Sequence, residues 1–94
     1  MYMLICMIQM QAGKRYSREL KCIEYFWIRS GRDCYAVSLR VLYDLLVRHP
    51  DYVVELNLPG HPRAVPAKTA GGEIYIRSKP HFYLRDSLFE LPII

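Results

Sequence analysis

The sequence predicts an α+β fold, with a mostly antiparallel β-sheet, one main helix at about residues 38–49 packed on one face, and an apolar C-terminal tail. Several short segments alternate apolar and polar residues, as half-buried strands do. One segment repeats its apolar residues at the period of a helix. The chain has 94 residues and is 52% hydrophobic, so residues 1–94 are expected to form one small domain with a single core.

The first third of the chain is expected to form a strand and then a hairpin. Met3–Met10 is an apolar run of strand length, and the polar residues 11–19 form a connection. Residues 21–30 form a second strand, in which alternation places one set of side chains towards the core: Cys22, Glu24, Phe26 and Ile28. The other set points outwards: Ile23, Tyr25, Trp27 and Arg29. Gly31 favours a turn, and residues 34–37 complete the hairpin.

The helix has a predicted beginning, an apolar face and an end. The Ser38 hydroxyl is placed to cap the first turn. An apolar stripe follows at helical spacing, made of Leu39, Leu42, Tyr43 and Leu46 and widened by Val41 and Leu45. Pro50 is expected to stop the helix.

The second half of the chain predicts three further strands. Residues 51–58 place Tyr52, Val54, Leu56 and Leu58 on one face, as a half-buried strand does. Residues 61–70 contain Pro62 and Pro66, so a strand there is expected at a sheet edge. Gly71 and Gly72 mark a hairpin turn before a strand at residues 73–77.

The tail, residues 79–94, is too apolar to be solvated, and its large apolar residues are Phe82, Leu84, Leu88, Phe89, Leu91, Ile93 and Ile94. We expect it to pack back on the sheet, because a small domain needs all of its apolar groups; the alternative is a docking peptide for another chain. Ser87 and Glu90 have the spacing of a helix capping box.

The cysteines and the start of the chain indicate a reducing, cytoplasmic setting. Cys6, Cys22 and Cys34 are an odd, widely spaced set, so we expect free thiols, two of them facing the core. Residues 2–10 are too few to span a bilayer, and no basic residue precedes them as in a signal peptide.

No pattern in the sequence predicts catalysis or metal binding, so we expect a protein without enzyme activity, cofactor or metal. His49, His61 and His81 lack the spacing that places two ligands on one helix face or strand face. Glu24 is the carboxylate of most interest, because burial among apolar neighbours would raise its pKa; the alternatives are a solvent-facing position or pairing with a nearby cation.

The C-terminal half of the chain carries a further pattern, formed by Tyr75, Ile76, Arg77 and Ser78 and then by Ser87, Leu88, Leu91 and Pro92. On these residues, the segment from about 21 to 92 is similar to an uncharacterised domain family of small bacterial and phage proteins. The resemblance implies a fold and a phage or mobile-element setting, and it implies no catalytic residue.

The charge distribution gives the main functional lead. The formal charge is +4, and residues 14–32 account for all of it, with six basic and two acidic residues. Aromatic residues, Tyr16, Tyr25, Trp27 and Tyr35, lie in or beside this window. The candidate partner-binding residues are Arg15, Arg18, Tyr25, Trp27, Arg29 and Arg32.

Two partner classes suit these residues. Exposed Tyr, Trp and Arg are the residue types that anchor protein interfaces, so we expect a small binding protein that occludes a site on another protein. With the phage resemblance, this suggests an inhibitor or regulator of a host protein. An exposed sheet edge would also support a homodimer. The alternative is a nucleic-acid-binding module, in which the cations meet phosphates and the rings stack on bases.

Overall fold

The computed structural model describes residues 1–79 and 85–94, and its fold is the predicted α+β class. Six strands form one sheet: β1 (Tyr2–Met10), β2 (Ile23–Ser30), β3 (Asp33–Ser38), β4 (Val53–Leu56), β5 (Arg63–Lys68) and β6 (Ile74–Lys79). One helix, α1 (Leu39–Arg48), connects β3 to β4. Two short 3₁₀ helices, η1 (Leu20–Cys22) and η2 (Ser87–Glu90), precede β2 and follow β6.

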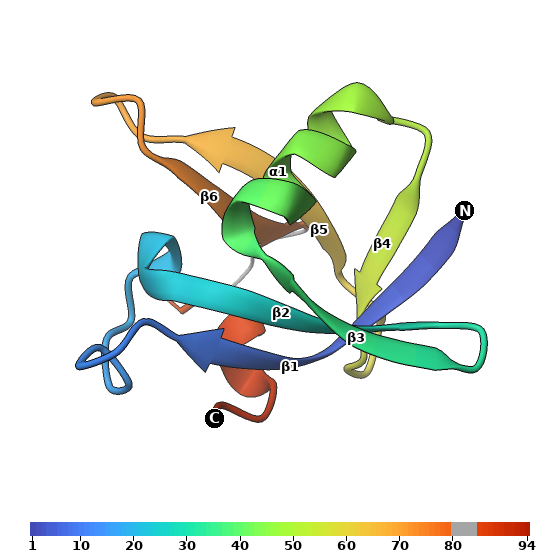
Figure 1. The fold of residues 1–94 in the computed structure, drawn as a ribbon, viewed down its shortest axis with the longest axis horizontal. Helices are drawn as coiled ribbons and strands as arrows, with labels where there is room; N and C mark the ends of the chain where they lie inside the picture. Colours follow the sequence, from blue (N-terminus) through green and yellow to red (C-terminus); the bar gives the residue numbers. More distant parts are fainter. Residues whose placement is uncertain (80–84) are drawn as a thin grey trace.

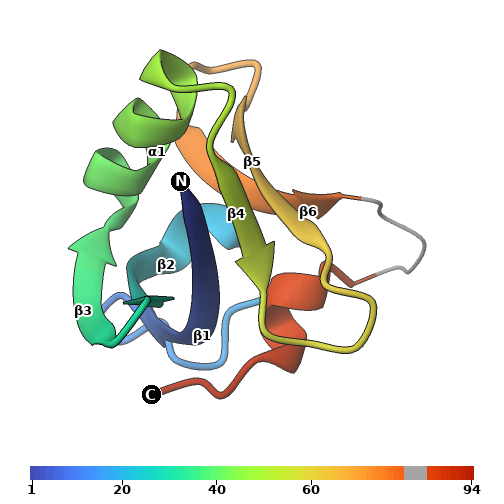
Figure 2. The ribbon, with the colours of Figure 1, turned by 90° about the vertical axis from the view of Figure 1, so that its right-hand side faces the viewer.

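The strand order is β3-β2-β1-β4-β5-β6, and every neighbouring pair is antiparallel except β1 and β4. That parallel pair requires a crossover, which the β2–β3 hairpin and α1 supply. The halves β1–β3 and β4–β6 diverge from the β1–β4 junction, and α1 lies between them (Figure 1 and Figure 2). The prediction of a mostly antiparallel sheet with one main helix is confirmed.

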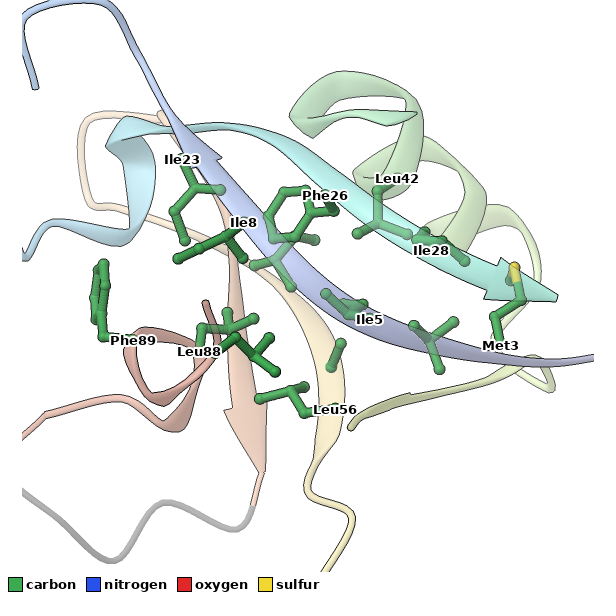
Figure 3. Close-up of a cluster of buried hydrophobic side chains, with 14 of the residues drawn as sticks. Met3, Ile5, Ile8, Ile23, Phe26, Ile28, Leu42, Leu56, Leu88 and Phe89 are labelled. Carbon is green, nitrogen blue, oxygen red and sulfur yellow. The ribbon is translucent and has the colours of Figure 1, made fainter. Parts of the chain in front are cut away.

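The core lies on the face of the sheet that α1 and η2 share. Figure 3 shows Leu42 of α1 and Leu88 of η2 pointing into one cluster with Ile5 and Ile8 of β1 and Phe26 of β2. All five side chains are fully buried. Burying a side chain of this size contributes about 1.5–3 kcal/mol, so this cluster is the main source of stability.

Two β-bulges in the β1–β2 pair change which side chains face the core. Ile5 and Met7 oppose the adjacent residues Ile28 and Trp27, so Cys6 is an extra residue in β1. In the same way, Glu24 is extra in β2. A bulge shifts the alternation by one position, and this brings Ile23 into the core, fully buried. The predicted outward position of Ile23 is therefore wrong.

The helix begins and ends as predicted. Ser38 is the N-cap, and its hydroxyl accepts a hydrogen bond from the Val41 amide at 3.2 Å. Leu42 and Leu46 are buried, and the apolar stripe packs on the sheet. Val41 does not widen that stripe, because it lies on the solvent side of α1 and is 55% exposed.

The proline-containing strand β5 is not at an edge, in contrast to the prediction. It lies between β4 and β6, but its pairing with β4 consists of one register position, Glu55 opposite Arg63. The rest of β5, including Pro66, is paired on the β6 side alone. Because β4 does not pair with this part of β5, the missing N–H of Pro66 removes no hydrogen bond on that side, as at a sheet edge.

The tail packs back on its own sheet. Ile93 pairs in parallel with Ile8, beside the half of β1 that extends beyond β4. The Ile8 amide donates to the Pro92 carbonyl, and the Ile94 amide donates to the Ile8 carbonyl, each at 3.0 Å. Leu88, Phe89 and Leu91 are buried, which confirms the expected packing. The predicted contributions of Phe82 and Leu84 lie outside the described residues.

The cap of η2 is Asp86, not the predicted box of Ser87 and Glu90. The Asp86 carboxylate accepts from the Leu88 amide at 2.9 Å, which caps η2. It also accepts from the Ser78 amide of β6 at 2.9 Å. One buried carboxylate therefore joins the tail to the outer edge of β6.

The cysteines are free thiols, but the expectation that two face the core is wrong. Cys22 is buried in η1, Cys6 is half-buried in its bulge, and Cys34 is exposed on β3. Among the described residues, no helix has the length and apolar character needed to cross a membrane.

Candidate interaction surface

The outer face of the sheet, which we define as the side of β1–β3 opposite the core, gathers three of the six predicted partner-binding residues. Tyr25, Trp27 and Arg29 lie along its central strand, β2. Their neighbours on this face are Leu4, Met7 and Gln9 of β1 and Cys34 and Ala36 of β3. Each of these eight residues is half-buried or exposed, so no helix or loop covers this face within the described parts of the chain.

Trp27 is at the centre of the outer face, opposite Met7 on one side and Ala36 on the other. The residue is half-buried. Its Nε1 atom is inaccessible to solvent and has no hydrogen-bond partner in residues 1–79 and 85–94. A buried donor without an acceptor costs about 1–3 kcal/mol. The Nε1 edge of the ring is therefore shielded from solvent, while the residue as a whole remains partly accessible to a partner.

One end of the outer face carries a small charged cluster. Leu4 of β1 opposes Arg29 on one side and Glu55 of β4 on the other. The pKa of Tyr2 is raised, mainly because the hydrogen bond that its hydroxyl donates to the Glu55 carboxylate favours the protonated form. The positive charge of Arg29 acts on the pKa of Tyr2 in the opposite direction, because it favours the ionised hydroxyl.

The remaining arginines do not join Trp27 on this face. Arg32 is exposed in the β2–β3 turn, next to the Arg29 end of β2. Arg15 and Arg18 lie in the loop before β2, at the opposite end of the strand. Arg15 donates to the Ile93 carbonyl at 3.5 Å, and the Arg18 guanidinium lies 5.7 Å from the centre of the Phe89 ring. The basic window is therefore divided into two separate groups.

Two of the aromatic residues near the window also lie elsewhere. Tyr35 opposes Ile28 and shares the core side of the sheet, where its hydroxyl contacts the Met3 sulfur at 3.8 Å. Tyr16 is in the loop and is 85% exposed. Alternation along β3 could have excluded Tyr35, because it is one residue out of phase with Ala36.

The candidates for other chemistry are not brought together. His49 stacks on Tyr52 with ring centres 4.4 Å apart, and His61 is exposed, while His81 is outside the described residues. In the described parts of the chain, no group of three or more His, Cys, Asp or Glu residues could hold a metal ion. Glu24 is half-buried at its bulge. A shallow groove of about 300 Å³ next to Arg18 and Tyr75 is rimmed by the ion pair of Lys21 with Glu73, 3.3 Å apart.

The sheet edges differ in a way that the sequence analysis did not predict. At the edge formed by β6, the Ser78 amide is bonded to Asp86, and η1 and η2 lie against the strand. The other edge is β3, which no described segment covers. The sequence suggested an open edge without saying which strand forms it. The chain leaves β3 directly into α1 and returns on the far side of β1, and this return marks β3 as the edge.

Comparison of the chain with protein-family models, with curated proteins and with solved structures found no match.

Proposed function

We propose that this chain is a small, non-enzymatic binding protein whose outer face recognises another protein in a stoichiometric complex. The observation that supports the proposal most directly is the row of Tyr25, Trp27 and Arg29 on an uncovered sheet face. Tyr, Trp and Arg dominate the binding energy of protein interfaces, and large half-buried rings lose little conformational entropy on binding.

The surroundings of the row support a protein partner over a nucleic acid. Leu4 and Met7 make the flanking surface partly apolar, as in the centre of a protein interface. Arg15 and Arg18, which a phosphate-binding surface would use together with Arg29, lie at the other end of β2 and contact the tail. A nucleic-acid partner is the second candidate, because Trp27 can stack on a base while Arg29 and Arg32 meet phosphates.

Capture from a bacterial lysate tests the proposal, with four forms of the full chain as bait. These are the wild type, Trp27→Ala, Arg29→Glu and the matched control Tyr16→Ala, which removes an exposed ring outside the outer face. We expect one protein to be retained in a 1:1 ratio by the wild type and by Tyr16→Ala, and to be lost with the other two. Circular dichroism shows whether each variant is folded.

Nuclease and salt separate the two partner classes. A protein complex anchored by Trp27 should survive nuclease treatment and change little with salt, whereas phosphate contacts weaken steeply as counterions are released. Retention of the same protein by Trp27→Ala at wild-type levels would contradict both forms of the proposal.

More specifically, we propose that the partner is a host protein, which a phage or mobile element inhibits or regulates through this chain. This part rests on the resemblance of the C-terminal segment, carried by Tyr75 to Ser78 and by Ser87, Leu88, Leu91 and Pro92. The reducing interior of a cell suits the free thiols, so we propose a cytoplasmic site of action.

A further inference from the structure

The open edge of β3 has hydrogen-bonding groups directed away from the sheet. Ser30 and Asp33 flank the two-residue turn of Gly31 and Arg32, so they form a hydrogen-bonded pair. In an antiparallel ladder such pairs alternate with non-hydrogen-bonded ones. The backbone N–H and C=O groups of Cys34 and Ala36 therefore point outwards, and no described segment lies beside them.

This edge also lacks the features that normally prevent pairing with another strand. Proteins protect edge strands with lysine, proline, a bulge or a covering segment. β3 has the sequence DCYAVS, pairs with β2 in regular register, and is exposed from Asp33 to Ala36. At the opposite edge, Asp86 accepts from the Ser78 amide, and η1 and η2 lie against β6, so the two edges differ.

We propose that β3 binds an extended peptide segment of the partner as a seventh strand, and that this segment carries an acidic side chain facing Arg29 and Arg32. The inference rests on the proposed function and adds the mode of recognition. Strand addition uses backbone hydrogen bonds for affinity and alternate side chains for specificity.

The outer face explains the preference for an acidic side chain. An added strand would lie about 10 Å from β2, which is two strand spacings. Cys34 and Ala36 lie between them opposite Arg29 and Trp27, and both side chains are small. Because Arg29 is exposed and Cys34 is small, the Arg29 side chain can extend over Cys34 to a carboxylate on the added strand. Arg32, exposed in the adjoining turn, adds positive charge at the same end.

A second copy of the chain is less suited to this position. Directly opposite residues lie on the same face of a sheet, so two antiparallel β3 strands could pair about Ala36 or about Tyr35. The first pairing places Arg32 of one copy opposite Arg40 of the other, and the second places Arg32 opposite Ser38. Neither supplies a carboxylate to Arg32, and the first adds like charge.

Synthetic peptides test the inference directly. The probe is an extended peptide of about eight alternating Thr and Val residues with one Glu on the outward side, and its twin has Lys in place of Glu. Trp27 is the only tryptophan, so its fluorescence reports binding next to the edge. We expect the Glu peptide to bind about tenfold more tightly than the Lys twin, and the difference to shrink in Arg29→Glu and at high salt.

The variant Ala36→Pro tests binding at the β3 edge separately from binding at the outer face. It removes an N–H that the fold leaves unused, and proline is tolerated at such positions. We expect this variant to keep the free energy of unfolding of the wild type and to lose peptide binding. Hydrogen exchange of the wild-type Cys34 and Ala36 amides gives an independent measurement, because both should slow at least severalfold when the Glu peptide is bound.

Each remaining outcome overturns a defined part of the reasoning. Unchanged exchange at Cys34 and Ala36, no binding of either peptide, or full binding by folded Ala36→Pro would overturn the strand addition. If the protein forms a concentration-dependent dimer that Ala36→Pro abolishes, the strand that pairs with β3 belongs to a second copy of the chain. If an oligonucleotide slows hydrogen exchange at Cys34 and Ala36, the ligand of this edge is a nucleic acid. If Ala36→Pro keeps the captured protein that Trp27→Ala loses, the proposed function stands and this inference fails.

Discussion

Replacing Asp86 with alanine should destabilise the protein strongly, because one carboxylate satisfies two buried amides. Asp86 is 6% exposed, and its two oxygens accept from the Leu88 and Ser78 amides at 2.9 Å each. Loss of a helix cap costs about 0.5–2 kcal/mol. A buried amide left without an acceptor costs about 1–3 kcal/mol. Together we expect a loss of roughly 2–4 kcal/mol in the free energy of unfolding.

A loss of that size is easily measured in a domain of this length. Small domains have about 5–15 kcal/mol of stability in total, and each kcal/mol shifts Tm by about 4–8 °C. Urea unfolding should be followed both by the fluorescence of Trp27 and by circular dichroism, whose agreement supports a two-state transition. Trp27 lies on the outer face, away from Asp86, so its signal reports global unfolding.

Two further variants control this measurement. Asp86→Asn keeps one acceptor oxygen, and Oδ1 lies within hydrogen-bond distance of both amides, 2.9 Å from Leu88 and 3.3 Å from Ser78, so the loss should be about half as large. Glu90→Ala removes an exposed ion pair with Arg85 and should cost about 0–1 kcal/mol. If Asp86→Ala cost no more than Glu90→Ala, the carboxylate would not join the tail to β6 as we have argued.

Three other predictions follow from single contacts. Ser38→Ala removes the α1 cap and should cost about 1 kcal/mol in urea unfolding, with a loss near zero contradicting the role of the hydroxyl. Leu88→Ala empties a fully buried site and should cost about 2–5 kcal/mol; a smaller loss would mean that the tail packs loosely. Hydrogen bonding to Glu73 raises the pKa of Lys21, so Glu73→Gln should lower that pKa in an NMR titration. Because the raised pKa favours the folded state only while Lys21 is protonated, the contribution should vanish as pH rises above the Lys21 pKa, and an unshifted pKa in Glu73→Gln would contradict it.

Local patterns in the sequence predicted the elements that depend on local physics. The stripe from Leu39 to Leu46 and the Ser38 hydroxyl locate α1 in the sequence, although a helix of 10 residues takes most of its stability from packing on the sheet. The turn at Gly31, whose φ is 61°, fixes the β2–β3 hairpin in the same way. The alternation from Tyr25 to Arg29 placed Tyr25, Trp27 and Arg29 on one side, and the structure agrees.

Features that depend on distant segments could not be predicted in this way. The bulges at Cys6 and Glu24 arise from the match between two strands, and each strand read alone shows no interruption. Asp86 became the cap of η2 because β6 supplies a second amide to the same carboxylate. The basic window from Lys14 to Arg32 was continuous in sequence, but the length of β2 separates its two ends in space.

β3 is exposed because the C-terminal segment lies against other strands of the sheet. The last residues pair with β1 at Ile8, and Asp86 accepts from the Ser78 amide of β6, so the described C-terminal residues lie against β1 and β6 and not along β3. The same apolar tail laid along β3 would have covered the outward groups of Cys34 and Ala36. Since nothing in the core depends on that edge, a substitution that blocks it should leave folding unchanged while abolishing binding. That separation of stability from recognition is the property that the Ala36→Pro experiment measures.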